Sequence, residues 1–518
     1  MASEPLDVSS QIPQKASGPK KSSLMIDHGS NGNQGGAEAA SNGLAFPRIV
    51  SPNGDLIIEH TDPSSTAANM SWQVSSKMLI EKSPYFRAML DPVKFAEGRQ
   101  LAQQIEALNI NLNSHSEFNA ETTEDSDQIS LPVVYITANT VTKLCGPDVL
   151  GLFIKVLCLD CMDDHVKQSF QNALKIESPS TIAKLIHIAD AFNSLDQIKA
   201  ILRSIDYQYG KKGRASVSRF STVLLKMKED RIRQIILISK TIQNPIVTRV
   251  FTHVLVIAGS RFWRNAPEPP SGEYLQWHYL PSNVEEELYY RRQCVMNTIT
   301  DLHAYFLRAY GALEDTDPNP APPRSSLGAA FSTSSQTRHF QCRAGLANAS
   351  QCDMFQLGQM VRFFTMRSKT AFVGSNLTDP DFSLDPSSED GDIEIQDHSP
   401  ASSDVITTIT SLRQYPDYQI DAHHGSCGVR RRLLPIIPCI EKYLLDSQGL
   451  LGIDYVIWSN IDARHSAQWI GSRKTHSVDV RQAQIVSISA HRGEPKSRRW
   501  VDRYAEALFT AKSRNWEA

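Results

Sequence analysis

The stretch Val74–Leu90, VSSKMLIEKSPYFRAML, decides the fold that the sequence predicts. It follows a candidate strand, Met70–Val74, and contains the helix start signal Ser83-Pro84. Serine is a good N-cap acceptor, and proline fits the first helical turn, where its missing N–H costs nothing. The apolar side chains that follow share one helix face at spacings of three and four: Phe86, Met89 and Leu90. We therefore expect a strand that leads into short, packed helices.

The sequence on either side of this stretch extends the pattern. Asp55–His60 is a second candidate strand that can pair antiparallel with Met70–Val74, and Gln128–Thr137 suggests a third. Pro147–Leu159 has helical apolar spacing, and Lys175–Ile205 contains two short helices, the first with another Ser-Pro start. The predicted fold class is α+β, with helices around a small sheet followed by mostly α-helical C-terminal regions.

Val74–Leu90 resembles the hallmark segment of BTB/POZ domains, in which a strand enters a helical hairpin through a V-x-S-x-x-L…S-x-x-F-x-x-M-L pattern. The residues that fill this pattern are Val74, Ser76, Leu79, Ser83, Phe86, Met89 and Leu90. Lys175–Ile205 is similar to the later helical hairpin of the same fold. The polar stretch before Gln128 resembles the fungal branch of the family, as do EDRIRQIILISKTIQNP at 229–245 and HHGSCGVRRRLLPIIPCIEKYLL at 423–445.

Composition and this resemblance together predict the domain organisation. Ser/Gly/Asn-rich and acidic polar stretches bury too little apolar surface to offset the entropy of ordering, and proline clusters disfavour helix. The predicted parts are a disordered tail at 1–47, a BTB/POZ-like domain at 48–210 with a polar insertion at about 102–127, a helical extension at 211–312, a linker at 313–336, and a mostly helical region at 337–518 with an acidic disordered loop at about 378–404.

The resemblance implies a protein–protein interaction scaffold or adaptor that self-associates, because many BTB/POZ domains dimerise. We expect protein partners, with a homodimer foremost. Tyr85, Phe86 and Met89 are the candidate interaction surface. The alternative is that these side chains fill the core of the domain itself, as apolar residues at helical spacing usually do.

Two other functions stay open at this point. The resemblance admits a substrate adaptor of a cullin-type ubiquitin ligase, although residues 153–164, FIKVLCLDCMDD, lack the aromatic-rich turn that family members usually have there. A transcriptional regulator in the nucleus rests only on the short basic clusters Arg430–Arg432 and Lys496–Arg499. With 53 basic and 56 acidic residues the net charge is −3, which argues against a dedicated nucleic-acid binder.

Targeting and membrane signals are weak in this sequence. The N-terminus, MASEPLDVSSQIPQ, has no apolar core of the kind a signal peptide needs. The richest apolar stretch, Val250–Gly259, is far shorter than the ~20 residues of a bilayer span. We therefore expect no membrane partner and a cytoplasmic or nuclear location, where the eight cysteines stay reduced.

Two sets of residues have the side chains of a metal site. Cys158 and Cys161 form an isolated CxxC, which lacks a second pair at finger-like spacing. The densest other set is His423, His424, Cys427 and Cys439, whose spacings match no zinc finger pattern. For this set we favour a polar turn that leads into a packed helix. No G-x-S-x-G, H-E-x-x-H or Rossmann glycine motif is present, so we predict no enzyme, and no catalytic, cofactor-binding or metal residues.

Overall fold

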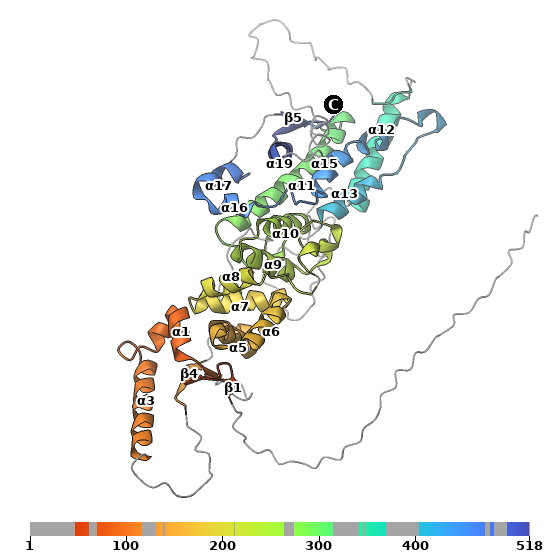
Figure 1. Ribbon diagram of the computed structural model, residues 1–518. Helices are drawn as coiled ribbons and strands as arrows, with labels where there is room; N and C mark the ends of the chain where they lie inside the picture. Colours follow the sequence, from red (N-terminus) through yellow and green to blue (C-terminus); the bar gives the residue numbers. More distant parts are fainter. Residues whose placement is uncertain are drawn as a thin grey trace, which may run out of the picture. The chain divides into compact units, whose positions relative to one another are not determined.

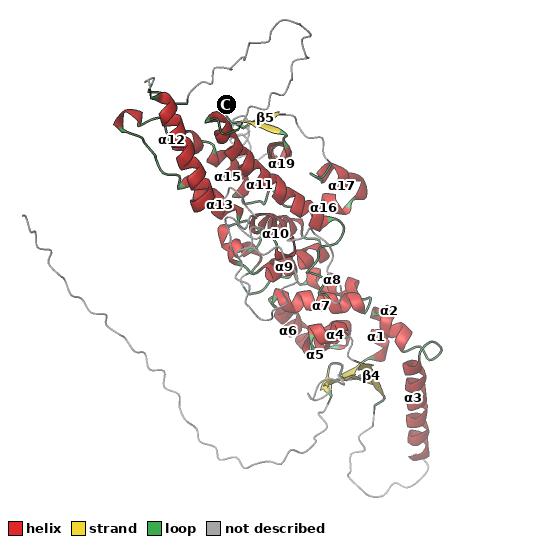
Figure 2. Cartoon of the chain, turned by 180° about the vertical axis from the view of Figure 1, so that it is seen from behind, coloured by secondary structure: helices red, strands yellow, loops and turns green. Residues whose placement is uncertain are grey.

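The computed structural model describes residues 47–61, 70–115, 131–137, 140–211, 213–263, 274–313, 341–344, 348–368, 404–471, 477–480 and 495–516. The chain divides into two units, Met1–Leu44 and Ala45–Ala518, and the first lies outside the described residues. The predicted tail, linker and acidic loop also lie almost wholly outside them. The fold is α+β and mostly helical, as predicted, and its strands are confined to two small sheets (Figure 2).

The strands are β1 (Arg48–Ile49), β2 (Leu56–Thr61), β3 (Met70–Val74), β4 (Val133–Thr137), β5 (Ser477–Asp479) and β6 (Ser513–Asn515). The first group of helices is α1 (Ser76–Lys82), α2 (Pro84–Met89), α3 (Ala96–His115), α4 (Thr140–Cys145), α5 (Pro147–Leu157), η1 (Leu159–Cys161), α6 (Asp164–Lys175), α7 (Pro179–Ala191) and α8 (Leu195–Ser204). Helix α3 occupies the first part of the predicted polar insertion.

The second group of helices is η2 (Arg214–Ser216), η3 (Thr222–Lys226), α9 (Glu229–Thr241), α10 (Pro245–Ala258), η4 (Arg261–Trp263), α11 (Val284–Ala309), α12 (Ala349–Arg362), η5 (Phe363–Arg367), α13 (Val405–Arg413), η6 (Ala422–His424), α14 (Arg430–Leu433), α15 (Ile437–Leu444), α16 (Tyr455–Ser459), α17 (Ile461–Ala467) and α19 (Pro495–Thr510). Prolines at the start of α10 and in the first turn of α15 fit the helix ends, where no backbone donor is lost.

The larger sheet has the strand order β1-β3-β2-β4. β2 and β3 pair antiparallel, with Leu56 opposite Val74 and Ile58 opposite Trp72, and this confirms the predicted pairing. β4 adds to the other side of β2 in parallel. Side chains alternate along β2 between buried and half-buried, which is the period of a strand with one face on the core.

Serine side chains cap the starts of α2 and α7, as the sequence predicted. The Ser83 hydroxyl accepts a hydrogen bond from the Phe86 N–H at 3.4 Å and donates one to the Phe192 carbonyl at 3.1 Å. The Ser178 hydroxyl accepts from the Thr181 N–H at 3.1 Å and begins α7. Helix α5 packs against β3 and α7, and α7 packs against α9, so α5 and α7 lie between the sheet and the α9–α10 pair (Figure 1).

The C-terminal region packs onto α10 through a buried histidine. His253 contacts the Leu444 carbonyl through Nε2 at 3.1 Å and accepts the Leu451 N–H through Nδ1 at 3.1 Å. These contacts make the ring neutral, with its proton on Nε2. One core runs from Val50 to Trp516, so the described residues between 404 and 516 contribute to the same hydrophobic interior as the first half.

A buried ion pair on α11 reinforces this docking. Arg291 pairs with Glu287 one turn earlier at 2.7 Å and donates to the carbonyls of Leu451 (3.1 Å) and Gly452 (2.8 Å). The Glu287 carboxylate also accepts the backbone N–H of Trp469 at 2.9 Å. Both charges are buried. Besides binding each other, they form hydrogen bonds with backbone groups of the C-terminal region, so these buried charges are satisfied only while that region is docked.

We expect His253 to make the fold acid-sensitive. Burial lowers the pKa of His253 to about 3, whereas the unfolded chain has a histidine pKa of about 6.5. Between these values only the unfolded state binds the proton. The contribution of His253 to stability is therefore complete above pH ~6.5 and is lost progressively as the pH falls toward 3. Urea denaturation measures how the free energy of unfolding changes with pH. Between pH 3 and 6.5 this slope should be smaller in His253→Gln than in the wild type by up to about 1.4 kcal/mol per pH unit, the contribution of one proton. His423→Asn is the control for an exposed histidine, and an unchanged slope in His253→Gln would contradict the prediction.

Candidate functional site

The predicted interaction residues divide between core and surface. Phe86 is 1% exposed and Met89 is 7% exposed, so both lie in the core of the domain, which corrects their prediction as surface residues. The Phe86 ring stacks on Phe192 with centroids 5.6 Å apart. Tyr85 is 40% exposed, although the edge of its ring packs against Phe192. The physical reason is the spacing: the 86/89 face turns inward, and position 85 turns outward.

Exposed apolar side chains gather along the chain around Tyr85. Among the described residues from 80 to 95, large hydrophobic side chains are exposed at Ile80, Tyr85, Val93 and Phe95, and Val93 is 84% exposed. They belong to α1, α2 and the turn that follows α2. Exposed apolar side chains that are close in the chain, next to a small sheet, offer a partner more buried area than isolated ones do.

The CxxC pair lies at the end of α5 and in η1. Cys158 is buried at the end of α5, and burial raises the pKa of its thiol to about 11. Asp160, between the two cysteines, pairs with Lys82 and Lys167 at 2.5 and 3.1 Å. Among the described residues, no further histidine, cysteine or carboxylate completes a ligand set around this pair. Cys158 therefore packs as a small apolar group.

A cysteine–histidine cluster forms in the C-terminal region. It contains Cys342, Cys352, His424 and Cys427, and the four ligand atoms all lie within 4.8 Å of one another. Cys342 Sγ is 3.4 Å from His424 Nδ1 and 3.7 Å from Cys427 Sγ. Cys342 is half-buried and the other three are buried. All eight cysteines of the chain are described, and all have free thiols.

Three segments bring this cluster together. Cys342 lies in the short segment 341–344, where the Asp353 carboxylate accepts the N–H of Gln341 at 2.8 Å and of Cys342 at 3.0 Å. Cys352 lies in the first turn of α12. His424 ends the short helix η6, and the Cys427 N–H donates back to the His424 carbonyl at 3.1 Å. This turn places both side chains on one side of the segment.

The surroundings of Cys342 and Cys352 favour their neutral thiols. Burial, together with the neighbouring Cys342 and Cys427, raises the pKa of Cys352 to about 12. Burial also raises the pKa of Cys342. A thiol under these conditions is a poor nucleophile at neutral pH, because the thiolate is the reactive form. Cys342 and Cys352 therefore lack the lowered pKa of an activated cysteine nucleophile.

The sequence pointed to only half of this cluster. Of the four residues considered together there, His424 and Cys427 belong to it, whereas His423 is exposed and Cys439 is bonded to the Pro435 carbonyl at 3.8 Å. Cys342 and Cys352 were missed. The only sequence signal for them was that they are cysteines in the same half of the chain, on the other side of the acidic stretch.

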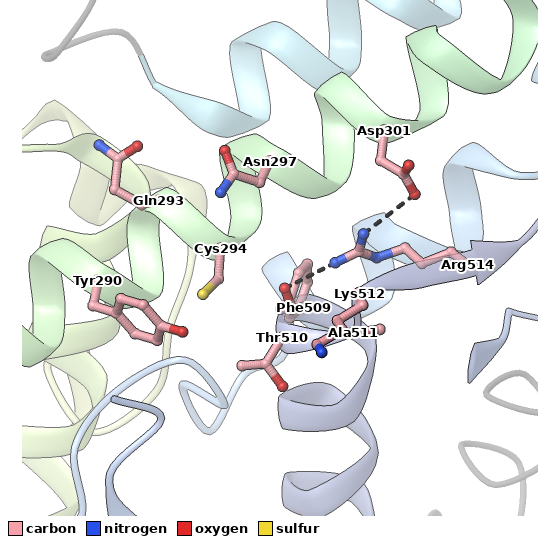
Figure 3. Close-up of a pocket in the computed structure, with 10 residues that line it drawn as sticks. All are labelled: Tyr290, Gln293, Cys294, Asn297, Asp301, Phe509, Thr510, Ala511, Lys512 and Arg514. Carbon is pink, nitrogen blue, oxygen red and sulfur yellow. Dashed lines mark hydrogen bonds and ion pairs between the residues drawn. The ribbon is translucent and has the colours of Figure 1, made fainter. Parts of the chain in front are cut away.

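A cavity of about 310 Å³ lies between α11 and the end of α19 (Figure 3). Two charged residues of its lining bind each other: Arg514 pairs with Asp301 at 3.2 Å, and it also donates to the carbonyls of Leu508 and Phe509. Its ten lining residues also include Cys294, Thr510 and Lys512, and the carboxylate of Asp301 is bound to Arg514 and to the Trp516 indole.

The basic cluster Arg430–Arg432 is used within the chain. Arg430 donates to the Tyr415 carbonyl at 2.5 Å. Arg432 donates to the Tyr305 hydroxyl at 2.7 Å, bonds Gln341, and lies over the Phe306 ring. These contacts leave Arg431 as the exposed member. The second basic cluster, Lys496–Arg499, lies in α19, but its side chains are outside the described residues.

The described part of the chain contains no helix that is both long and apolar enough to cross a bilayer. Comparisons of the sequence with family models and with curated proteins, and of the structure with solved structures, found no match.

Proposed function

We propose that this protein is an interaction scaffold or adaptor that self-associates through a BTB/POZ-like domain at about 48–210. The single observation that carries the proposal is the set of exposed apolar side chains between Ile80 and Phe95, within and directly after the segment that resembles the BTB/POZ hallmark. The arrangement of β3 leading into α1 and α2, with helices around a small sheet, is compatible with that resemblance.

A second copy of this chain is the partner we infer for this surface. The resemblance implies dimerisation, and the same apolar set on two copies would be self-complementary, as a twofold interface requires. Tyr85 suits such an interface because its ring buries a large area while its hydroxyl stays solvated. The engaged arginines of the basic cluster at 430–432 offer little to nucleic acid, so a protein partner is favoured over DNA.

The test is the solution mass of the full-length chain, because the core runs through to Trp516 and a shortened chain would expose it. Light scattering over a concentration series should give a dimer for the wild type. Tyr85→Asp and Val93→Asp should each weaken self-association at least tenfold, since each puts a charge into an apolar contact.

The matched control is Ile461→Asp, which puts the same charge on a residue of α17 that is 71% exposed. It should leave the mass unchanged. A wild type that stays monomeric at the highest concentration would overturn self-association as the role. If Ile461→Asp weakened self-association as much as the other two variants, residues 80–95 would not be the specific interface.

A further inference from the structure

We propose that Cys342, Cys352, His424 and Cys427 bind one Zn²⁺ ion as a closed structural site. Three thiolates and one imidazole are the ligand chemistry that zinc takes in structural sites. The four come from three segments, with nine residues between Cys342 and Cys352, more than seventy between Cys352 and His424, and two between His424 and Cys427. Their convergence is therefore a property of the fold and not of a local motif.

The distances match a tetrahedron of zinc ligands. With Zn–S near 2.3 Å and Zn–N near 2.0–2.1 Å, the edges of a tetrahedral site are ~3.8 Å between two sulfurs and ~3.5 Å between sulfur and nitrogen. The Cys342–Cys427 Sγ separation is 3.7 Å, and the Cys342 Sγ–His424 Nδ1 separation is 3.4 Å. The other ligand atoms are no more than 4.8 Å apart, so small side-chain rotations complete the site.

The surroundings support the ligands as they do in metal sites. The Arg343 N–H points to Cys427 Sγ at 3.4 Å, which is the donor that a coordinated thiolate needs. The other ring nitrogen of His424, Nε2, is buried without a hydrogen bond and lies 3.9 Å from the Asp421 carboxylate. A carboxylate on that side orients a histidine whose Nδ1 binds the metal.

Two other interpretations account for fewer of these residues. A disulfide would use two of the thiols and leave the third thiol and the imidazole buried beside it, and the 3.7 Å between Cys342 and Cys427 is far beyond an S–S bond of ~2.05 Å. A catalytic cysteine–histidine pair needs one thiol, and it gains nothing from two more. Four protein ligands also leave no open position on zinc, which makes the site structural.

The ion would join the segment 341–344 and the start of α12 to the turn at 422–427. That turn is already fixed to α11, because the Tyr310 hydroxyl donates to the Cys427 carbonyl at 3.2 Å. Zinc would therefore tie α12 to the core through side chains that otherwise lack charge or strong hydrogen bonds. Metal binding of this kind contributes directly to folding.

The first experiment measures zinc in the full-length chain, expressed with zinc supplementation and purified by gel filtration, by elemental mass spectrometry. We expect about one zinc ion per chain, as four ligands imply. Cys352→Ala and His424→Asn should each lose at least ninety per cent of it, a roughly tenfold drop. Cys439→Ala and His423→Asn are the matched controls, because they remove the same side chains close by in sequence, and they should keep the ion.

Reconstitution with Co²⁺ covers the case in which a ligand variant does not fold. The wild type, stripped of metal and given Co²⁺ alone, should show the intense visible bands of tetrahedral cobalt and the thiolate charge-transfer band in the near ultraviolet. A zinc-free wild type that also gives no such bands would overturn the proposal. So would equal metal in His424→Asn and His423→Asn, or a Cys342–Cys427 disulfide found by alkylation without reductant.

Discussion

Replacing Arg233 by methionine is expected to lower the free energy of unfolding by about 3–5 kcal/mol, as removal of one partner from a buried ion pair does. All five N–H groups of this buried guanidinium are used. Two bind Glu285 at 2.6 and 3.1 Å, and the others bind Glu229, Ser260 and the His278 carbonyl. Burial opposes the charge, but Glu285 and Glu229 raise the pKa of Arg233.

The cost comes from what the substitution leaves behind. Glu285 is 1% exposed, and its carboxylate would keep only the Trp263 indole at 2.7 Å and the Leu280 N–H at 2.8 Å. The double variant Arg233→Met/Glu285→Gln should therefore cost less than the two single variants summed, by at least about 1 kcal/mol. Urea denaturation measures all three.

The matched control is Arg214→Met, whose partner Asp206 lies at 2.9 Å in an exposed pair. It should change the stability by less than about 1 kcal/mol, because water screens exposed pairs. If Arg233→Met lowers the free energy of unfolding no more than this control does, the buried ion pair and its hydrogen bonds do not contribute to stability.

Local signals predicted the first part of the fold well. The Ser-Pro starts at 83 and 178 and the strand pair of β2 and β3 follow from residues a few positions apart, so a single sequence contains them. The same local spacing put Phe86 and Met89 on one helix face. It did not say whether that face meets the core or a partner, because this depends on Phe153 of α5 and on Phe192, the residue that follows α7.

Long-range polar contacts were out of reach. By sequence alone, the acidic run Glu285–Glu287 at the start of α11 indicates only side chains that suit the positive end of the helix dipole. In the structure Glu285 binds Arg233, and Glu287 binds Arg291 and backbone 182 residues later. A buried glutamate and an exposed glutamate look the same in the sequence, and only the tertiary packing shows which of them is buried.

The cysteine–histidine cluster was half predictable for the same reason. His424 and Cys427 are three residues apart, so a local search finds them, and Cys439 was added because it is next along the chain. The true neighbours, Cys342 and Cys352, come from the other side of a stretch of more than seventy residues between Cys352 and His424. Metal ligands on different segments are found by geometry and not by spacing.

Replacing Gly452 by alanine is expected to destabilise the protein by about 3–5 kcal/mol, because the new methyl group has nowhere to go. A Cβ built on Gly452 would lie 1.9 Å from the Arg249 carbonyl oxygen and 2.9 Å from Thr252 Oγ1. Both belong to α10, and a helix backbone carbonyl cannot rotate aside as a flexible side chain does. The segment around 452 would have to move away from α10.

That movement breaks specific hydrogen bonds of the docked C-terminal region. Arg291 donates to the Gly452 carbonyl at 2.8 Å, and the Ile453 N–H donates to Thr252 Oγ1 at 2.9 Å. The loss of each leaves a buried polar group unsatisfied, which costs about 1–3 kcal/mol. Besides the lower stability in urea, limited proteolysis should begin near residue 452 in this variant and not in the wild type.

Gly358→Ala gives the opposite expectation from the same chemical change. Gly358 lies inside α12, is exposed, and a Cβ there meets nothing within 4 Å. Alanine should stabilise the helix by up to about 1 kcal/mol, since glycine loses more backbone entropy on folding. The two variants add the same methyl group. If one lowers and the other raises the free energy of unfolding, the difference comes from the contact of residue 452 with α10. Two equal effects would mean that the C-terminal region is not seated on Arg249 as closely as the structure places it.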